Sequence, residues 1–419
     1  MVNQERQSFP DTIRIRLLRI LIAVGPIFAF RINDNTTFGV IDFLFIPLLV
    51  STLIYRETRI TKLELLYCVF LLISFMSQIF SMVAPNVGLF SISYHRLWAS
   101  FLPFALVMGI RHVDQNLVSQ LTSTFFISGL IAIVIGITLH HMGIELRTEQ
   151  QRLWVGGGYG NTARAGGLLG NSGNFGHFAA NWATIILFFS LANRNRFLKL
   201  FIITAIVLGC YSTFISSSRA AMLHLLVAFT CIVLIINVRT LFKIVLASLL
   251  IALLSLIYFP VFVELSGGAS FTLRRLDIFN LSGDSLFFQT IRFSSWDSLY
   301  NQFFENPFLG LGYKNPARIL GIYTDNAFMS TFLEFGLFAG ICYLVWWLSA
   351  LGAAVRQINA SRLWATAGMA VILSEIAHGT TLDTHTIWYS MPIVMAFIAL
   401  SIRMGSQAQR TLTHTDANT

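Results

Sequence analysis

The sequence predicts an all-α integral membrane protein with about twelve transmembrane helices and two long segments outside the membrane. Hydrophobic residues make up 55% of the chain and charged residues only 11%, with a mean hydropathy of +0.71. This balance lies outside the range of soluble domains. Apolar stretches of about twenty residues, the length of a membrane-crossing helix, recur along the whole chain. The net charge of +9 is spread over short clusters between these stretches, which argues against nucleic-acid binding.

The apolar stretches define the candidate spans one by one. They cover approximately residues 14–30, 38–54, 63–84, 91–110, 118–140, 175–192, 198–217, 220–237, 242–262, 328–350, 363–379 and 386–402. The first stretch, "LLRILIAVGPIFAF", has arginines before it but no small-residue cleavage site after it, so we interpret it as a retained span. The four cysteines lie within apolar runs without metal-ligand spacing and are expected to be packing residues.

The basic residues predict the orientation of the chain. Alternate connections carry Arg14, Arg16, Arg19, Arg56, Arg59, Lys62, Arg111, Arg194, Arg196, Lys199, Arg239, Lys243, Arg356, Arg362, Arg403 and Arg410. The positive-inside rule places this face and both termini in the cytoplasm, which requires an even number of spans. The predicted organisation is N-terminal helices at 1–140, a first outer loop at 141–174, central helices at 175–262, a large outer loop at 263–327, and C-terminal helices with a cytoplasmic tail at 328–419.

Three arginines on the predicted outer face form a candidate site for anionic groups. Arg219 follows three serines at the turn between two spans, and no acidic residue lies near it in sequence. Arg292 lies in an amphipathic stretch of the second loop, and Arg164 lies in the first. Guanidinium groups bind phosphate oxygens bidentately and remain charged. Because a charge at the end of a span is costly, we favour a functional role for Arg219 over that of an interfacial anchor.

Other polar residues allow more than one interpretation. Asp325 and Asn326 stand directly before a span, where capping is the default role, although a carboxylate could also accept a proton from an attacking hydroxyl. Tyr313 lies in a loop, where it could stack on a sugar ring. Glu375 could be a structural hydrogen-bonding acid, or an ion-pair partner of Arg219 or Arg96. The segment "HGTTLDTH", which starts at His378, matches no standard metal site, so a polar cap is favoured and no metal or cofactor is expected.

Four motifs in order resemble the signatures of the O-antigen ligase/polymerase family. They are "RAGGLLGNSGNFGHFAANWA", "SSSRAAML", "IRFSSWDSLYNQFFENPFLGLGY" and "TDNAFMSTFLEFGLFAG", and together they cover roughly residues 160–345. Each motif alone is weak, whereas their order and spacing are fairly specific. The N-terminal spans and the last two spans carry no motif of this kind.

The resemblance implies a glycosyltransferase-C-like fold and an inverting, metal-independent glycosyltransferase in the bacterial inner membrane. Its active site would face the periplasm, where the two outer loops lie, and its donor and acceptor would be undecaprenyl-pyrophosphate-linked glycans. A chain-length regulator and a flippase are further implied partners. Arg219 and Arg292 match the family arginines that hold the lipid pyrophosphate. Asp325 is the candidate base, and His177 is the second. The implied substrate-binding positions are Arg164, Arg219, Arg292, Asn174, Tyr313 and Asn326.

Four functions stay open at this point. Asp325 and Asn326 fall where ligases of the family typically have His-Asn, which favours a polymerase that joins repeat units. A ligase that moves glycan onto lipid A-core is the first alternative. A transporter or flippase is the second, and it is disfavoured because the mid-span positions look almost uniformly apolar and the motifs do not repeat. A non-catalytic scaffold within an export complex is compatible with any sequence.

Overall fold

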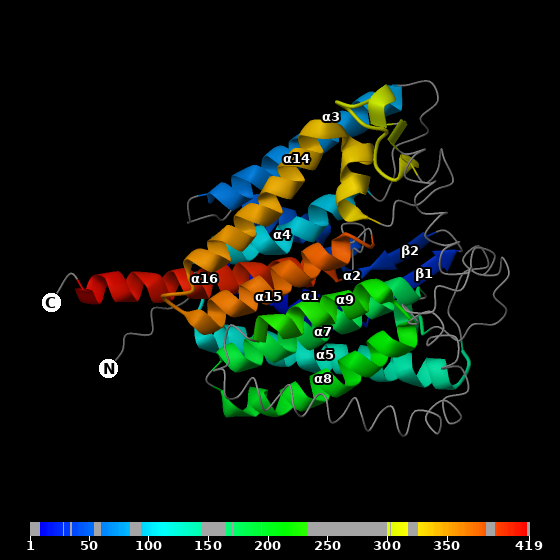
Figure 1. The fold of residues 1–419 in the computed structure, drawn as a ribbon. Helices are drawn as coiled ribbons and strands as arrows, with labels where there is room; N and C mark the ends of the chain where they lie inside the picture. The colour runs from blue at the N-terminus through cyan, green and yellow to red at the C-terminus, as the bar shows by residue number, and fades with distance from the viewer. Residues whose placement is uncertain are drawn as a thin grey trace.

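The computed structural model describes residues 9–27, 29–33, 36–53, 60–83, 94–144, 165–169, 171–193, 195–232, 300–301, 303–316, 326–382 and 390–416. Within these ranges helices dominate, and Figure 1 shows them running in roughly two directions along the molecule. The elements in chain order are α1 (Phe9–Val24), β1 (Ala29–Asn33), β2 (Thr36–Gly39), α2 (Val40–Leu53), α3 (Lys62–Val83), α4 (His95–Gly109), α5 (Gln115–His141), η2 (Gly167–Leu169), α7 (Ser172–Ala192), α8 (Arg196–Ser216), α9 (Arg219–Cys231), α14 (Ala327–Arg356), α15 (Arg362–Gly379) and α16 (Met391–Asp416).

The helices agree with the spans predicted from the sequence. Every predicted span except 242–262 overlaps one of them, and 242–262 lies outside the described residues. Six described helices are long and apolar enough to cross a membrane, namely Lys62–Phe80, Gln115–His141, Ser172–Ala192, Arg196–Ser216, Ala327–Arg356 and Met391–Thr411. The chain is therefore a multi-pass membrane protein, and the total of twelve spans stays a prediction.

The described residues are mainly helical, as the predicted all-α class requires, and one short hairpin lies between α1 and α2. Strands β1 and β2 pair antiparallel, with Ala29 opposite Gly39 and Phe30 opposite Phe38. The sequence carries the signal for this hairpin, because Asp and Asn residues at 33–35 favour a turn and the flanking Phe and Thr residues favour strands. The predicted first span had instead been extended to residue 30, whereas α1 ends at Val24, just before Gly25 and Pro26.

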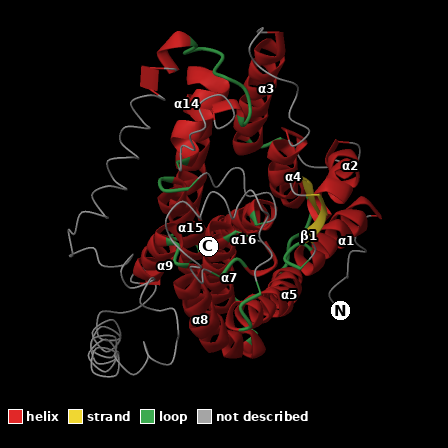
Figure 2. Ribbon diagram, turned by 90° about the vertical axis from the view of Figure 1, so that its right-hand side faces the viewer, coloured by secondary structure: helices red, strands yellow, loops and turns green. Residues whose placement is uncertain are grey.

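Helices α7 and α16 occupy the centre of the bundle. Helix α7 packs against α5, α8, α9 and α15, and α16 packs against α4 and α15. Small residues permit these close approaches: a Cβ on Gly209 of α8 would lie 2.5 Å from the Cβ of Ala183 on α7. In Figure 2, which views the molecule after a 90° turn, α16 lies inside the ring of helices while α3 and α8 lie at its periphery. The apolar side chains that α8 leaves exposed, such as Phe197, Leu200 and Ile203, are suited to contact with lipid.

Several basic residues of the predicted cytoplasmic face tie helix ends together. The guanidinium of Arg14 is buried, donates to the carbonyl oxygen of Gly109 at 2.8 Å, and pairs with Asp11 at 3.2 Å. Arg403 of α16 donates to the carbonyl oxygen of Arg111 at 3.0 Å. The start of α1, the end of α4 and the C-terminal part of α16 therefore share one end of the bundle.

Candidate functional site

The turn between α8 and α9 presents Arg219 at the start of a helix. Ser217 has a φ of 52°, the left-handed conformation that ends α8, and Ser218 caps α9 by accepting a hydrogen bond from the amide of Ala221 at 3.4 Å. Arg219 is the first residue of α9, and it is exposed. The positive end of a helix dipole and a guanidinium thus coincide, and together they favour an anionic group.

Helix α7 packs against this serine turn without a side chain in between. A Cβ on Gly176 would lie 2.6 Å from the Oγ of Ser216 and 2.8 Å from the Cβ of Ser218. The first predicted loop also reaches this turn, because the amide of Ala165 donates to the carbonyl oxygen of Ile215 at 3.0 Å. Residues 165–169 are therefore packed on the bundle, and the motif that begins at residue 164 meets the serine turn.

Replacing Gly176 by alanine is expected to displace the serine turn and to destabilise the bundle. The new methyl group overlaps Ser216 and Ser218, and overpacking of this kind costs roughly 1–3 kcal/mol. Thermal unfolding in lipid nanodiscs measures the loss of stability. Gly173→Ala in the same helix is the control, because its Cβ would meet only the Asn171 side chain at 3.2 Å and Leu382 at 3.8 Å. Equal behaviour of the two variants would contradict the expected role of Gly176.

The motif at residues 303–316 docks on a break in α14. Gly336 interrupts α14 with a φ of 81° and a ψ of 179°. The amides of Leu311 and Gly312 donate to the carbonyl oxygens of Leu333 and Glu334 at 2.8 and 2.7 Å. In return, the amide of Leu337 donates to the carbonyl oxygen of Pro307 at 2.7 Å. The backbone groups that the break frees are thus satisfied by the motif, which is how non-helical backbone is tolerated inside membrane proteins.

The N-terminal ends of α7, α9 and α14, which carry the sequence motifs, meet at α15. Asn326 caps α14 by accepting hydrogen bonds from the amides of Phe328 and Met329, both at 3.0 Å, so the capping role predicted for it is confirmed. Its side-chain amide also donates to the carbonyl oxygen of Thr380 at 3.1 Å, just past the end of α15. Because α15 packs against α7, α9 and α14, the starts of these three helices surround its C-terminal end.

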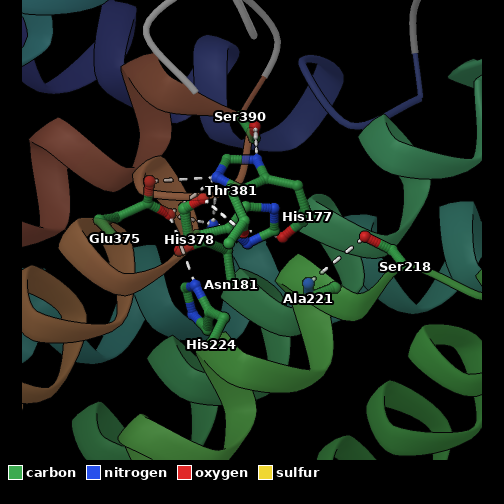
Figure 3. A network of polar contacts seen from close by, with 9 residues as sticks. All are labelled: His177, Asn181, Ser218, Ala221, His224, Glu375, His378, Thr381 and Ser390. Atoms are coloured by element: carbon green, nitrogen blue, oxygen red, sulfur yellow. Dashed lines mark hydrogen bonds and ion pairs between the residues drawn. The ribbon is translucent and has the colours of Figure 1, made fainter. Parts of the chain in front are cut away.

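A cluster of polar side chains lies inside the bundle below these helix ends, as Figure 3 shows. We call it the polar cluster, and it consists of His177, Asn181, His224, Glu375 and His378. All five are at most 1% exposed. The carboxylate of Glu375 lies 2.8 Å from the Nε2 of His177 and 3.8 Å from the Nδ1 of His224, and the side-chain amide of Asn181 donates to it. The other ring nitrogen of His177 faces the hydroxyl of Ser390 at 2.8 Å.

Two imidazoles of the polar cluster have polar atoms without hydrogen-bond partners. Neither ring nitrogen of His224 or His378 forms a hydrogen bond within the part of the chain that the structure describes. The ring of His378 lies 4.5 Å from that of His177 and 5.6 Å from that of His224, measured between centroids. Leaving a buried polar group unsatisfied costs about 1–3 kcal/mol, so the arrangement requires an explanation beyond packing.

Comparison with known families places these elements in context. The family model described as O-antigen ligase matches residues 204–344, which run from within α8 to within α14. This match supports the resemblance of the sequence motifs to the O-antigen ligase/polymerase family. The matched region holds the serine turn, the docked motif and the break in α14. A search of curated proteins found no match to the chain.

The structure describes only part of the site expected from the family resemblance. Arg164, Arg292 and Asp325 lie outside the described residues. Arg219 and Asn326 lie at the starts of α9 and α14, and Asn174 lies partly exposed in the first turn of α7. These three belong to the helices that surround the end of α15.

Two predicted site residues are enclosed by the helix bundle. Tyr313 is 1% exposed, and its ring stacks on Phe335 at a centroid distance of 6.1 Å, so in this structure it packs the bundle. The backbone amide of Tyr313 donates to the side chain of Gln78 on α3 at 2.7 Å. His177 is fully buried in the polar cluster, where Glu375 and Ser390 occupy its two ring nitrogens.

The structure also shows the role of Glu375 and the acidic partner of Arg96. Glu375 is the hydrogen-bonding acid that the sequence allowed, while the carboxylate that pairs with Arg96, at 2.8 Å, is Asp42. His378 lies inside the bundle and is not part of a polar cap. Asp383 and His385, from the same segment, lie outside the described residues. Among the described residues, no group of three or more His, Cys, Asp and Glu side chains could hold a metal ion.

Neither a role for His224 nor the grouping of the three histidines was predicted from the sequence. The expectation of almost uniformly apolar mid-span positions was wrong at this level of the bundle. A local signal was present, because His177 and Asn181 stand four residues apart and Glu375 and His378 three apart in apolar helices, which puts each pair on one helix face. That the two faces and His224 meet depends on the packing of α7, α9 and α15, which the sequence does not reveal.

Proposed function

We propose that this protein is an enzyme of the O-antigen ligase/polymerase type that joins lipid-linked oligosaccharide repeat units at the periplasmic face of the bacterial inner membrane. The observation that supports it most is Arg219, exposed at the first turn of α9. The guanidinium and the positive end of the helix together favour binding of an anionic group, and the pyrophosphate of a lipid-linked glycan is such a group. The family match supports the reaction type.

The proposed reaction is a direct displacement without a metal ion. A sugar hydroxyl of the acceptor attacks the anomeric carbon of the donor, and the bond from that carbon to the phosphate oxygen breaks on the opposite face. The electron pair moves to undecaprenyl pyrophosphate, whose developing charge the guanidinium of Arg219 stabilises. We assign Arg292 and Arg164 to the same headgroup. We assign Asn174 and Asn326, at the starts of α7 and α14, to the sugars.

The proton of the acceptor hydroxyl requires a base. Asp325 is the first candidate because it directly precedes Asn326, whose cap ties the start of α14 to the end of α15. His177 is the second candidate; its buried position suits a role behind the reacting groups rather than in contact with them.

Purified protein in lipid nanodiscs, given only undecaprenyl-pyrophosphate-linked repeat units, tests the proposal. We expect a ladder of longer glycans that still forms in the presence of a chelator, because guanidinium groups replace the usual divalent ion. Products that appear only after lipid A-core is added would assign the protein as a ligase. A sample that forms no glycosidic bond with either acceptor would overturn the proposal.

Transport of lipid-linked glycan is a second candidate that one observation favours. Buried histidines and acids inside membrane bundles often mark proton pathways of transporters, and the polar cluster has this composition. Movement of a fluorescent lipid-linked glycan across a vesicle membrane, driven by a pH gradient and without bond formation, would support transport over transfer.

A further inference from the structure

Within the described residues, the polar cluster carries an acid that no arginine or lysine contacts. The side chains in contact with Glu375 there are those of His177, Asn181 and His224. An isolated charge inside the bundle is costly. The Nε2 of His177 lies 2.8 Å from the carboxylate of Glu375, so the two groups are close enough to share a proton. The geometry of the cluster therefore favours binding of one proton.

The two remaining histidines extend this site. His224 and His378 are fully buried, and neither ring nitrogen of either has a hydrogen-bond partner in the described ranges. The centroids of the three imidazoles lie between 4.5 and 6.4 Å apart. Imidazoles at such spacing can pass a proton between them with one intervening water or a small ring movement. Unsatisfied nitrogens cost stability, so their retention is explained if a proton or a water occupies them during function.

The position of the cluster connects it to the proposed reaction site. His224 stands five residues after Arg219 on α9, which is roughly 7 Å deeper along the helix axis. His378 stands two residues before Thr380, whose carbonyl oxygen accepts from Asn326. Asn326, which follows the candidate base Asp325 in sequence, is thus held beside the end of α15, the helix that carries Glu375 and His378.

The polar side chains around Glu375 within the described residues are His177 and Asn181 from α7, His224 from α9, His378 from α15, and the neutral Ser390 before α16. Arg219 is the charged residue of α9 that stands five residues before His224, and it is exposed. Asp383 and His385 of the segment before Ser390 lie outside the described residues.

We propose that the polar cluster is a proton-binding site that receives the proton released by the attacking hydroxyl. The origin of that proton rests on the proposed function. The new bond joins the acceptor oxygen to the anomeric carbon, and the bond to phosphate breaks with its electron pair. The hydroxyl proton passes by way of the base to an imidazole of the cluster, and from there to water on the outer face. Glu375 and His224 touch no reacting atom and are positioning residues.

The substitution Glu375→Gln tests this site. It keeps the size of the side chain and one acceptor oxygen but removes the negative charge that a proton would neutralise. We expect the maximal rate of transfer to fall by roughly a hundredfold with the substrate KM unchanged, because the loss concerns proton transfer. We also expect the pH profile of the rate to lose the limb that reports protonation of the polar cluster. His224→Gln is expected to lower the maximal rate in the same way but less strongly, because His224 lies 3.8 Å from the carboxylate.

Two further measurements separate the proton site from a structural role and from the proposed function. Ser374→Ala is the matched control, because it removes a buried hydroxyl beside Glu375 that has no hydrogen-bond partner among the described residues and does not titrate. Infrared difference spectra of the substrate-free protein, recorded across a pH titration, report histidine protonation directly. We expect Glu375→Gln, but not Ser374→Ala, to remove one protonation event.

Each outcome bears on one proposal. Active Glu375→Gln protein with an unchanged pH profile and infrared titration would overturn the proton site while leaving the transfer reaction intact. A wild-type protein that binds the proton but forms no glycosidic bond would overturn the proposed function while the proton site stands. If Glu375→Gln lowers the thermal stability but its folded fraction keeps the wild-type pH profile, Glu375 has a structural role only and the proton site is overturned.

Discussion

Replacing Arg219 by lysine is expected to lower the rate of glycosyl transfer by a factor of about a hundred or more while the protein folds normally. The side chain stands exposed at the first residue of α9, so its exchange disturbs little packing. Lysine keeps the positive charge, but a point charge cannot reproduce the two parallel hydrogen bonds that a guanidinium makes to phosphate. The ratio kcat/KM for elongation of lipid-linked repeat units measures the effect.

Arg196 provides a matched control for this substitution. It is also an exposed arginine at the first residue of a helix, but it starts α8 and therefore lies at the opposite end of α8 from Arg219. We expect Arg196→Lys to leave the rate unchanged. Normal polymerisation by Arg219→Lys, at a protein level equal to that of the wild type, would remove Arg219 from the proposed site.

The second large effect is expected for Gly336→Ala in α14. The φ of 81° and ψ of 179° at this residue belong to a region that only glycine adopts readily. The added Cβ would also lie 2.1 Å from the carbonyl oxygen of Phe308, which must then move together with the docked segment at 303–316. Strain and overpacking together are expected to cost about 3 kcal/mol or more. A fall in the thermal unfolding midpoint in nanodiscs, with loss of transfer activity, is the measurement.

Gly352→Ala is the control for the broken helix. It lies in the same helix, where an added Cβ meets no other atom within 4 Å. An alanine in a regular helical turn is expected to raise stability by up to about 1 kcal/mol. If the two variants unfold at the same temperature, the break at Gly336 does not hold the docked motif.

The helices were predictable because each one carries its own signal. Runs of about twenty apolar residues fixed the positions of helices such as α5, α7 and α8 to within a few residues. Caps were readable as well, as Asn326 before α14 shows. The hairpin β1–β2 was not predicted, because its short strands adjoin apolar runs that a membrane span explains equally well.

The candidate site was only partly predictable. The exposed turn at Arg219 follows from a serine-rich break between two apolar runs, which is a local pattern. Enclosure of the Tyr313 ring depends on the contacts that its segment makes with α3 and α14, which are distant in sequence. The sequence position of Tyr313 in a loop indicated exposure, because no local sequence pattern shows that this segment packs against the bundle.

The sequence by itself determined the class of the protein, the order of its helices, the family motifs and the arginine at the start of α9, because each depends on residues near one another in the chain. Only the tertiary structure decided that Glu375 from α15 meets His177 from α7 and His224 from α9. The physical reason is that the sequence of an apolar helix with one polar residue looks the same whether that residue faces lipid or a partner helix. Which of these occurs depends on helix packing, which here is set by close contacts of small residues such as Gly176 and Gly209.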